Sequence, residues 1–539
     1  RCFCTFGPQR HWLVSAAPIV SILTPVYRPD MDHFKACVGS VVDQTSSDWE
    51  LILVDDASGD AELAEFLAKC AAHPQIRVVH RSENGGIVVA SNDALRAADG
   101  KLVAFLDHDD MLAPTAIEQV VIASQANPTA EALYSDRGHI DEAGERVGRD
   151  FLKPRWSPER LRGNMYIAHL TVLSREAALA VGGFHAEFEG SQDHDLVLRV
   201  TERGKPVVHI PEVLYLWRMS ARSTAADPDT KPYARINGAK AVQEHCKRTG
   251  IDATVVQSEA AGWYELERRP TPGLTASIII PTYGSHATIR GEDLCMVVEA
   301  VRSVAKHEYS VNYEFVVVYD DRPGIDLGYL DDLAEIAGDR LKLVRFTEPF
   351  NFSRKVNAGA VNASGDVLVL LNDDTEVITP DWLDHLCSLA TESGVGAVGA
   401  KLLLENGWVQ HGGVGLAYVG VIVNVDNRQI NDGGYYGTLR SDHEVMAVTG
   451  ACLAVRSDLY REIGGFSEDF AGSFNDVDFC FKLLNGGYRN IVANTVEMYH
   501  YESLTRDPEV KPSEHDNLYG RWYWLMQQDP YLRKQSPPR

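Results

Sequence analysis

The sequence has no paired cysteine motif, although it contains 9 cysteines among its 539 residues. They are scattered along the chain as Cys2, Cys4, Cys37, Cys70, Cys246, Cys295, Cys387, Cys452 and Cys480. The C-x-x-C spacing that is typical of zinc sites is absent. Scattered cysteines favour reduced thiols over a disulfide framework.

Long apolar runs and an excess of basic charge are also missing. A membrane-spanning helix needs roughly 18–20 apolar residues, and no run approaches that length. Residues 1–4 do not begin a signal peptide, because no charged region followed by a long apolar region is present. The formal net charge of −25 argues against nucleic acid, since binding a polyanion depends on basic surface. We therefore expect a cytoplasmic protein with no nucleic-acid partner.

Two alternatives about location stay open at this point. The chain does not begin with methionine, so it could be a fragment of a longer protein with a membrane anchor outside it. Peripheral association with the inner face of the plasma membrane is also compatible with the sequence, and the oligomeric state is not indicated.

The sequence repeats one ordered set of motifs. Asp321 lies as far beyond Asp56 as Asn357 lies beyond Asn92. The acidic motifs after a later apolar segment keep the same offset. Two later motifs recur at slightly larger offsets, a Gly-Gly-Phe motif and an Asp-x-Asp motif. A shared register over this length indicates a duplication.

Each copy is long enough to bury its own core, and far longer than the roughly 20–50 residues of a solenoid repeat. With 45% hydrophobic and 24% charged residues, the composition is that of an ordinary globular protein. The predicted organisation is an N-terminal extension (1–16), a first domain (17–267), a linker (268–273), a second domain (274–506) and a C-terminal tail (507–539).

Strands alternate with helices in both copies. Residues 20–23 and 277–280 are mostly apolar and rich in β-branched side chains, which suits a parallel strand covered on both faces. Apolar residues at near-helical spacing follow in 34–42, and further strands are predicted at 50–54 and 102–106. This pattern predicts a doubly wound α/β fold, in which ligands bind at the carboxyl ends of the strands.

An acidic cluster lies at such a strand end in each copy. The strand at 102–106 is followed by Asp107 and Asp109, and the matching apolar segment of the second copy is followed by Asn372, Asp373 and Asp374. Hard oxygen ligands next to a bound diphosphate suit Mg²⁺ or Mn²⁺. Recurrence in both copies favours a metal site over simple strand termination and helix capping by aspartate.

An EF-hand is the alternative calcium site for this acidic segment. Counted from Asp107, Glu118 falls at the twelfth loop position, where an EF-hand needs its glutamate. The sixth position is Leu112 and not the glycine that the turn requires, and Pro114 interrupts the loop. The sequence therefore does not predict an EF-hand.

A further aspartate begins a predicted helix late in each copy. Asp193 and Asp476 lie in a first helical turn, where the helix dipole favours the ionised carboxylate. Helix capping is the alternative role, although Ser191 or Asn475 could already cap. A glycine-containing turn that faces a cleft is where a general base is useful, so both aspartates are candidate bases.

Taken together, these motifs resemble the inverting family 2 glycosyltransferases of the GT-A class, particularly the tandem bacterial enzymes of O-antigen, capsule and rhamnose-polysaccharide synthesis. The resemblance covers nearly the whole chain and implies two Rossmann-like, mainly parallel nucleotide-diphospho-sugar transferase domains in tandem. It implies catalytic bases at Asp193 and Asp476 and metal ligands at Asp109, Asp374 and His500. It implies nucleotide-binding residues at Pro25, Tyr27, Asp56, Asn92, Asp107, Pro281, Tyr283, Asp321, Asn357, Asp373 and Arg506.

The chemistry of such a transfer agrees with these residue types. The donor, a nucleoside diphosphate sugar, loses a diphosphate, whose developing charge Mg²⁺ or Mn²⁺ neutralises. The acceptor hydroxyl needs a carboxylate to take its proton as it attacks from the opposite face, which inverts the anomeric configuration. The resemblance implies a growing bacterial surface glycan, lipid-linked, as the acceptor.

The two copies differ near their ends. Similar sequences commonly carry histidine at the position of Leu216, and a leucine cannot ligate a metal, whereas the second copy has His500. The first copy also has Asp136-Arg137 where relatives more often have an acidic pair. An alternative is therefore that only the second domain is catalytic and that the first binds the acceptor or serves assembly.

Two alternatives from other classes remain. A nucleotidylyltransferase shares a nucleotide-binding α/β core, but it is expected to carry a glycine-rich basic loop after the first strand. This chain has Thr24-Pro25-Val26-Tyr27 there. A non-enzymatic carbohydrate-binding protein would not need two ordered sets of carboxylates at strand ends.

Overall fold

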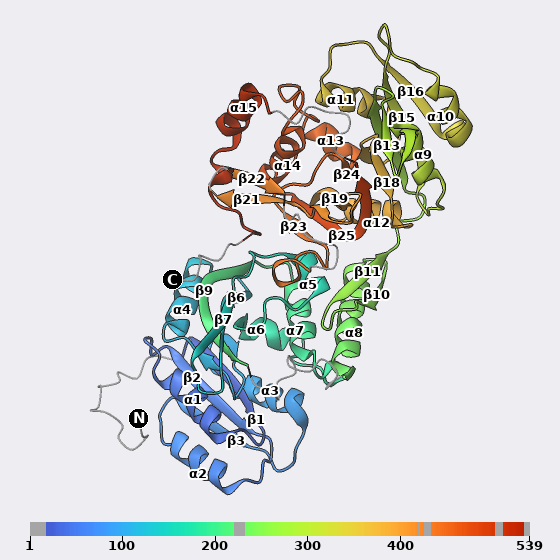
Figure 1. The fold of residues 1–539 in the computed structure, drawn as a ribbon. Coiled ribbons are helices and arrows are strands. Elements are labelled where there is room, and N and C mark those ends of the chain that lie inside the picture. Colours follow the sequence, from blue (N-terminus) through green and yellow to red (C-terminus); the bar gives the residue numbers. More distant parts are fainter. Residues whose placement is uncertain (1–17, 220–231, 419–420, 425–432, 502–509, 533–539) are drawn as a thin grey trace. The chain divides into compact units, whose positions relative to one another are not determined.

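The computed structural model describes residues 18–219, 232–418, 421–424, 433–501 and 510–532 (Figure 1). The chain forms two compact units. The first consists of Arg1–Trp156 and Met165–His245, and the second of Ser157–Asn164 and Cys246–Arg539. Arg506 and the cysteines at positions 2 and 4 lie outside the described residues. No helix of the described part is long and apolar enough to cross a membrane.

The first unit is built on one sheet of nine strands with the order β3-β2-β1-β4-β8-β6-β9-β5, and β7 pairs with β6. The strands are β1 (Val20–Val26), β2 (Trp49–Asp55), β3 (Ile76–His80), β4 (Leu102–Phe105), β5 (Met111–Leu112), β6 (Ala132–Ile140), β7 (Arg146–Phe151), β8 (Thr171–Ser174) and β9 (Val207–Arg218). The helices are α1 (Met31–Val42), α2 (Ala61–Cys70), α3 (Gly86–Ala97), α4 (Ala116–Ala126), α6 (Arg175–Ala180), α7 (Gln192–Thr201) and α8 (Pro232–Thr249), whose last turn belongs to the second unit.

The second unit has a main sheet of ten strands with the order β16-β15-β12-β17-β24-β19-β25-β18, to which β20 and β23 add at the side. These strands are β12 (Thr275–Thr282), β15 (Asn312–Asp320), β16 (Leu341–Phe346), β17 (Val367–Leu371), β18 (Thr375–Val377), β19 (Val395–Leu403), β20 (Val409–His411), β23 (His443–Val445), β24 (Cys452–Arg456) and β25 (Arg489–His500). Its helices are α5 (Pro158–Gly163), α9 (Met296–Ala305), α10 (Tyr329–Ala337), α11 (Phe352–Asn362), α12 (Trp382–Ala390), α13 (Ser457–Glu462), α14 (Asn475–Asn485) and α15 (Pro512–Trp522).

Three small hairpin sheets complete the second unit. They pair β10 (Ala253–Gln257) with β11 (Tyr264–Arg268), β13 (His286–Ile289) with β14 (Glu292–Cys295), and β21 (Val414–Tyr418) with β22 (Val421–Asn424).

The eight strands in the main order of each sheet correspond one to one, and the second sheet has β23 in addition. In each, the first four strands of the order are parallel, as in the pairing of β1 with β2 and β4, and of β12 with β15 and β17. The remaining strands include antiparallel pairs, such as β4 with β8 and β17 with β24. The predicted fold class, two tandem α/β domains with helix-flanked sheets, is confirmed. The second half of each sheet is mixed because its strands return by hairpins as well as by crossovers.

Apolar residues fill both faces of the parallel strands. Every residue of β17 is buried, as are Ile278, Ile279 and Ile280 of β12. Successive side chains of a strand point to opposite faces, so Ile278 and Ile280 belong to one core cluster and Ile279 to another. This is why the strands read as continuous apolar runs in the sequence.

A serine–glutamate brace joins the first two strands in both units. The hydroxyl of Ser21 donates to Glu50 (2.5 Å), and that of Ser277 donates to Glu314 (2.7 Å). The backbone N–H of a following glycine, Gly100 or Gly365, donates to the same serine hydroxyl (2.8 Å in both). A Cβ at Gly365 would lie 2.5 Å from the nitrogen of Ser277, so only glycine fits this approach. The brace confirms the duplication at the level of side-chain contacts.

The compact units do not divide at residues 268–273, where the sequence predicts a linker. Arg268 ends β11 and its side chain is fully buried, because its guanidinium pairs with the carboxylates of Glu159 and Glu392. Glu159 lies on α5, which belongs to the second unit although it precedes the last strands of the first in the sequence. The predicted domain boundaries stay a prediction.

Three arginines and three glutamates form a compensated ion-pair network around Arg268. Arg162 pairs with Glu159 (2.5 Å) and Glu392 (3.0 Å). Burial alone would raise the pKa of Glu159, but Arg268 and Arg162 more than offset it and lower the pKa to about 2. The third pair, Arg489 with Glu444, adjoins this cluster through the backbone N–H of Glu159, which donates to Glu444 (3.3 Å).

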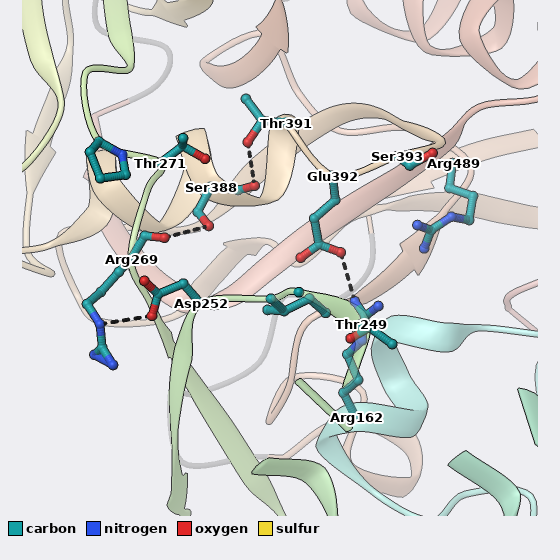
Figure 2. A pocket seen from close by; sticks show the side chains of 13 residues that line it. Arg162, Thr249, Asp252, Arg269, Thr271, Ser388, Thr391, Glu392, Ser393 and Arg489 are labelled. Carbon is teal, nitrogen blue, oxygen red and sulfur yellow. Dashed lines mark hydrogen bonds and ion pairs between the residues drawn. The ribbon is translucent and has the colours of Figure 1, made fainter. Parts of the chain in front are cut away.

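The network forms one wall of a polar pocket in the second unit (Figure 2). Figure 2 shows Glu392 bonded to Arg162 on one side and Asp252 bonded to Arg269 on the other. Every arginine of the lining has a carboxylate partner within the unit, Arg489 through Glu444. Because these charges cancel locally, we assign the wall to support of the fold.

Breaking this network should be costly. Arg268→Met removes one of the two cations that pair with Glu159 and Glu392 and leaves the buried charge of Glu159 undercompensated, so we expect the second unit to lose about 3–5 kcal/mol of stability. Urea unfolding checks this value. The matched control is Arg269→Met, whose exposed pair with Asp252 should contribute at most about 1 kcal/mol. Equal effects of the two variants would contradict a buried role for Arg268.

Candidate active sites

The predicted site residues of each unit follow the carboxyl ends of parallel strands. Tyr27 and Asp56 lie just beyond β1 and β2, and Asp107 follows β4 closely. The same holds for Tyr283 after β12 and Asp373 after β17. Parallel strands bring these ends to one edge of the sheet, where side chains can reach solvent. Pro25 and Pro281 are the penultimate residues of β1 and β12.

In the second unit, Asp374 and His500 lie side by side. The distance from Asp374 Oδ1 to His500 Nε2 is 3.2 Å, and both side chains are buried. Strand pairing explains this proximity, because Thr375 at the start of β18 pairs with His500 at the end of β25. The structure therefore brings together two residues that are distant in the sequence and that the family resemblance assigns to one metal site.

Gln410 fixes the orientation of this imidazole. Its Oε1 lies 2.7 Å from His500 Nδ1, and because Oε1 is an acceptor, Nδ1 carries the proton. Nε2 then faces Asp374 and Asn372, whose Nδ2 is 3.4 Å away, and can ligate a metal ion when it carries no proton. Orientation of a histidine by a bond to its second nitrogen is typical of metal ligands. Gln410 belongs to a glycine-containing segment that the sequence suggests as a loop lining an acceptor cleft, but no motif in the sequence predicts its bond to His500.

Two oxygens beside His500 are buried and accept no hydrogen bond: Oδ1 of Asn372 and Oδ1 of Asp374. Buried oxygens of this kind normally have partners, so their state requires an explanation. Amide and carboxylate oxygens are ligands for Mg²⁺ and Mn²⁺, and the donor set therefore fits such an ion. No group of three or more His, Cys, Asp or Glu side chains is preformed for a metal in the described ranges, so further ligands must come from elsewhere.

Asp373 lies beside this pair and contacts the end of β12. The hydroxyl of Thr282 donates to Asp373 Oδ2 (2.6 Å). Burial is the main cause that raises the pKa of Asp373 to about 7, and the charge of Asp374 is the second. The contact places Asp373 next to Tyr283, which is 43% exposed and open to a ligand.

The candidate base of the second unit is held at the start of α14. Asp476 Oδ2 accepts from the backbone N–H of Gly450 (2.9 Å), and Oδ1 accepts from that of Val477 (2.8 Å). These two backbone donors fix the orientation of the carboxylate. Gly450 lies in the segment just before β24, so two distant parts of the chain position this aspartate.

In the first unit, the strand position of His500 is occupied by tryptophan. Met111 of β5 pairs with Leu216, and its counterpart in the second copy, Glu376 of β18, pairs with Tyr499. Leu216 therefore corresponds to Tyr499, and the next residue along the strand, Trp217, corresponds to His500. Neither Leu216 nor Trp217 can ligate a metal, so the expected loss of a ligand in this copy agrees with the structure at a position shifted by one.

The first unit instead places a histidine near its acidic motif from another segment. His169, which precedes β8, has its Nε2 3.9 Å from Asp107 Oδ2, and its ring stacks on Tyr215 with centroids 4.9 Å apart. Burial lowers the pKa of His169 to about 4, with the charge of Asp193 opposing the shift. Burial also raises the pKa of Asp193. The structure thus groups His169 with both Asp107 and Asp193.

A buried aspartate that the sequence left unassigned supports the acidic motif of the first unit. Asp110 accepts from the hydroxyl of Tyr215 (2.6 Å) and from the backbone N–H of Arg218 (2.7 Å). The Arg218 guanidinium donates to the carbonyl of Asp109 (2.7 Å). Burial and the charges of Asp107 and Asp109 raise the pKa of Asp110 well above its usual range. These contacts fix the backbone that presents Asp107 and Asp109.

Asp56 and Asp321, the predicted ribose or base contacts, differ in environment. Asp56 is buried and accepts from Arg81 (2.8 Å) and from the backbone of Gly85 and Gly86 at the start of α3. Asp321 is partly exposed and pairs with Arg345. A nucleotide contact stays a prediction for both, and Asp321 is the more accessible of the two.

Asn92 and Asn357 each clamp a glycine turn. Asn357 Nδ2 donates to the carbonyl of Phe466 (2.9 Å), and its Oδ1 accepts from the N–H of Phe466 (3.1 Å) and the hydroxyl of Tyr460 (2.6 Å). Asn92 makes the equivalent pair of bonds to Phe184. This role follows from the tertiary structure, and a nucleotide contact by either side chain stays a prediction.

Comparison with known proteins identifies the class of domain that these sites define. The model of "Glycosyl transferase family 2" matches residues 21–179 and 277–464, which is more than half of the chain and one match in each copy. The chain therefore belongs to glycosyl transferase family 2.

Its curated relatives are longer proteins. An uncharacterized protein, y4gI, of Sinorhizobium fredii is 36% identical over 94% of this chain and 56% of its own length. The O-antigen biosynthesis protein RfbC of Myxococcus xanthus is 34% identical over 95% of this chain and 39% of its own length. A chondroitin synthase of Escherichia coli is 30% identical over 43% of this chain and 33% of its own length. The chain thus spans about half the length, or less, of these relatives.

Among solved structures, TarS of S. aureus in complex with UDP-GlcNAc aligns with 42% of this chain and 72% of its own. The sequence identity is 16% and the TM-score is 0.34.

Replacing Asn357 separates its two roles. Asn357→Ala removes the bonds to the N–H and C=O of Phe466 and leaves the N–H only its longer bond to the Tyr460 hydroxyl (3.4 Å), so we expect the second unit to lose about 1–3 kcal/mol of stability. Urea unfolding measures this loss, and titration of a nucleoside diphosphate on the folded variant tests the predicted contact. Unchanged stability would contradict the clamp, and unchanged nucleotide affinity would contradict the contact.

Proposed function

We propose that the chain is a bifunctional glycosyltransferase that transfers sugars from nucleotide-sugar donors to a growing bacterial surface glycan with inversion. Membership of glycosyl transferase family 2 supports the reaction class. The presence of one family match and one base candidate in each unit supports two active domains. The names of the relatives from Myxococcus and Escherichia support a surface polysaccharide as the product, and a lipid-linked acceptor reached at the membrane surface agrees with such a product.

The observation that carries this proposal is the arrangement around His500. Asp374 and Asn372 present buried, unsatisfied oxygens beside an imidazole that Gln410 orients. Asp374, His500 and the Asn372 amide oxygen would hold Mg²⁺ or Mn²⁺, with the diphosphate of the donor completing the ligands. The ion, when bound, would neutralise the charge that develops on the leaving diphosphate.

The remaining chemistry belongs to side chains of this chain. Asp476 takes the proton of the acceptor hydroxyl as its oxygen attacks the anomeric carbon, and the bond to the diphosphate breaks on the opposite face. The carboxylate can act in this way because Gly450 and Val477 hold it in one orientation. Tyr283 and Asp321 are the accessible side chains for the nucleoside. No covalent sugar–enzyme intermediate is required.

An alternative is that only the second unit is catalytic and that the first binds the acceptor or serves assembly. The specific observation in its favour is Trp217, which stands where the second unit has its imidazole. Nucleotidyl transfer is less well supported, because the family match points to glycosyl transfer. A screen of nucleotide sugars for metal-dependent release of nucleoside diphosphate, with each unit inactivated in turn, distinguishes these cases.

The first prediction from the proposal concerns the base. Asp476→Asn should lower the transfer made by the second unit by about 10²–10⁴-fold, because general base catalysis contributes in this range. Donor affinity should change little, since Asp476 acts on the acceptor. Product analysis and titration calorimetry measure the two effects.

The matched control for that variant is Asp293→Asn, an exposed carboxylate on β14, which should leave turnover unchanged. Asp193→Asn should remove only the linkage made by the first unit. Near-normal turnover of Asp476→Asn would overturn the assignment of the base.

The second prediction concerns the metal. His500→Ala should weaken Mn²⁺ binding to the nucleotide-bound protein, and Gln410→Leu should weaken it by about 10–100-fold, the usual effect of removing the group that orients a ligand. Electron paramagnetic resonance of free Mn²⁺ measures both affinities. His286→Ala, on the exposed hairpin β13–β14, is the control. Unchanged Mn²⁺ affinity in the His500 variant would mean that His500 is not a metal ligand.

A further inference from the structure

The helix that begins after the second unit's last strand contacts the loop that carries its candidate base. The buried carboxylate of Glu514, in the first turn of α15, accepts from the backbone N–H groups of Gly472 (2.7 Å) and Ser473 (3.1 Å). These two residues lie directly before α14, whose second residue is Asp476. Glu514 therefore fixes the backbone immediately ahead of the base.

The same loop contains a strained residue. Phe474, between Ser473 and α14, has a φ of 60°, which places a bulky side chain in the left-handed region. Such a conformation persists only where surrounding contacts determine it. The two bonds to Glu514 are such contacts, and they come from outside the loop.

The C-terminal end of α15 contacts a second residue close to the base. Asp478, two positions after Asp476, is fully buried, and its Oδ1 accepts from Trp522 Nε1 (2.7 Å) and Arg521 Nη1 (2.9 Å). Arg521 also donates to Asp469 (2.9 Å). Helix α15 thus contacts the chain on both sides of Asp476, and we call residues 472–478 the base segment.

The first unit provides a natural comparison. The counterpart of Asp478 there is Asp195, which follows Asp193 as Asp478 follows Asp476 and is also fully buried. Oδ2 of Asp195 accepts two hydrogen bonds from Arg199 of its own helix, which also donates to the carbonyl of Gly183 (2.7 Å). The second unit has Lys482 at the position of Arg199.

Lys482 makes only some of the contacts that Arg199 makes. Lys482 donates to the carbonyl of Gly465 (2.9 Å), as Arg199 does to that of Gly183, but its Nζ is 3.6 Å from Asp478. Arg199 reaches both groups through hydrogen bonds, whereas the single Nζ of Lys482 lies close to the carbonyl of Gly465 and farther from Asp478. The hydrogen-bond donors that Lys482 does not provide to Asp478 come from Arg521 and Trp522.

We propose that α15 is a positioning element for Asp476, in which Glu514, Arg521 and Trp522 hold the base segment. In the first unit α8 also contacts the loop ahead of Asp193, through the bond from Asn237 to the carbonyl of Glu189 (2.8 Å), but Asp195 takes its donors from its own helix. The proposal rests on the proposed function of Asp476 as the base. Glu514, Arg521 and Trp522 are positioning residues, because they act through the loop and through Asp478. The segment beyond β25 is then part of the catalytic unit and not an appendage.

The test compares variants of α15 in the full-length chain. Glu514→Leu should lower kcat for the second unit's transfer about tenfold or more, because small displacements of a catalytic group are costly, with donor affinity unchanged. Glu514→Gln keeps an acceptor oxygen and should retain most of the turnover. An unchanged kcat in folded Glu514→Leu would overturn the proposal.

A rescue experiment covers the case in which Glu514→Leu does not fold. The double variant Arg521→Met/Trp522→Phe removes both donors to Asp478 but keeps apolar packing against Phe481. Its kcat should fall, and adding Lys482→Arg should restore much of it, because this change recreates the arrangement of Arg199. Failure of Lys482→Arg to raise the kcat of the double variant would overturn the proposal.

A failure of the positioning role of α15 can be distinguished from a failure of the proposed function. If Asp476→Asn is active, the base assignment is wrong whatever α15 does. If Asp476→Asn is inactive while the α15 variants keep normal kcat, the base stands and the positioning role of α15 is wrong. The linkage made by the first unit should be unaffected by every α15 variant and serves as the internal control.

Discussion

The burial of both faces of each sheet is the constraint on which the rest of the structure depends. Polar side chains cannot lie along strands such as β17, whose residues are all buried, so they emerge where the strand ends. Parallel pairing then brings several such ends to one edge. Both candidate sites exist because two sheets of the same topology satisfy this constraint in the same way.

Buried charge is the second recurring feature, and each unit compensates it with local partners. Arg268 is paired with two glutamates, Asp110 is held by Tyr215 and Arg218, and Asp478 by Arg521 and Trp522. A buried charge without a partner is strongly destabilising, so these pairs constrain which segments pack together.

Much of the fold could be predicted from the sequence. The repeated register and the apolar strands predicted two α/β domains, and the strand ends of Asp107 and Asp373 predicted the edge at which the sites lie. The details that depend on strand register could not be predicted. The shift from Leu216 to Trp217 as the counterpart of His500 arises from the pairing of β5 with β9, which no motif encodes.

The sequence by itself determined the duplication, the fold class, the family and the residue types available for catalysis, because periodicity and motif order are properties of the chain alone. Only the tertiary structure decided which of those residues meet. Asp374 reaches His500, Gln410 orients it, and Glu514 holds the loop before Asp476 through contacts between segments that are distant in the chain. Such contacts are set by packing and by the compensation of buried polar groups, which act only once the chain has folded.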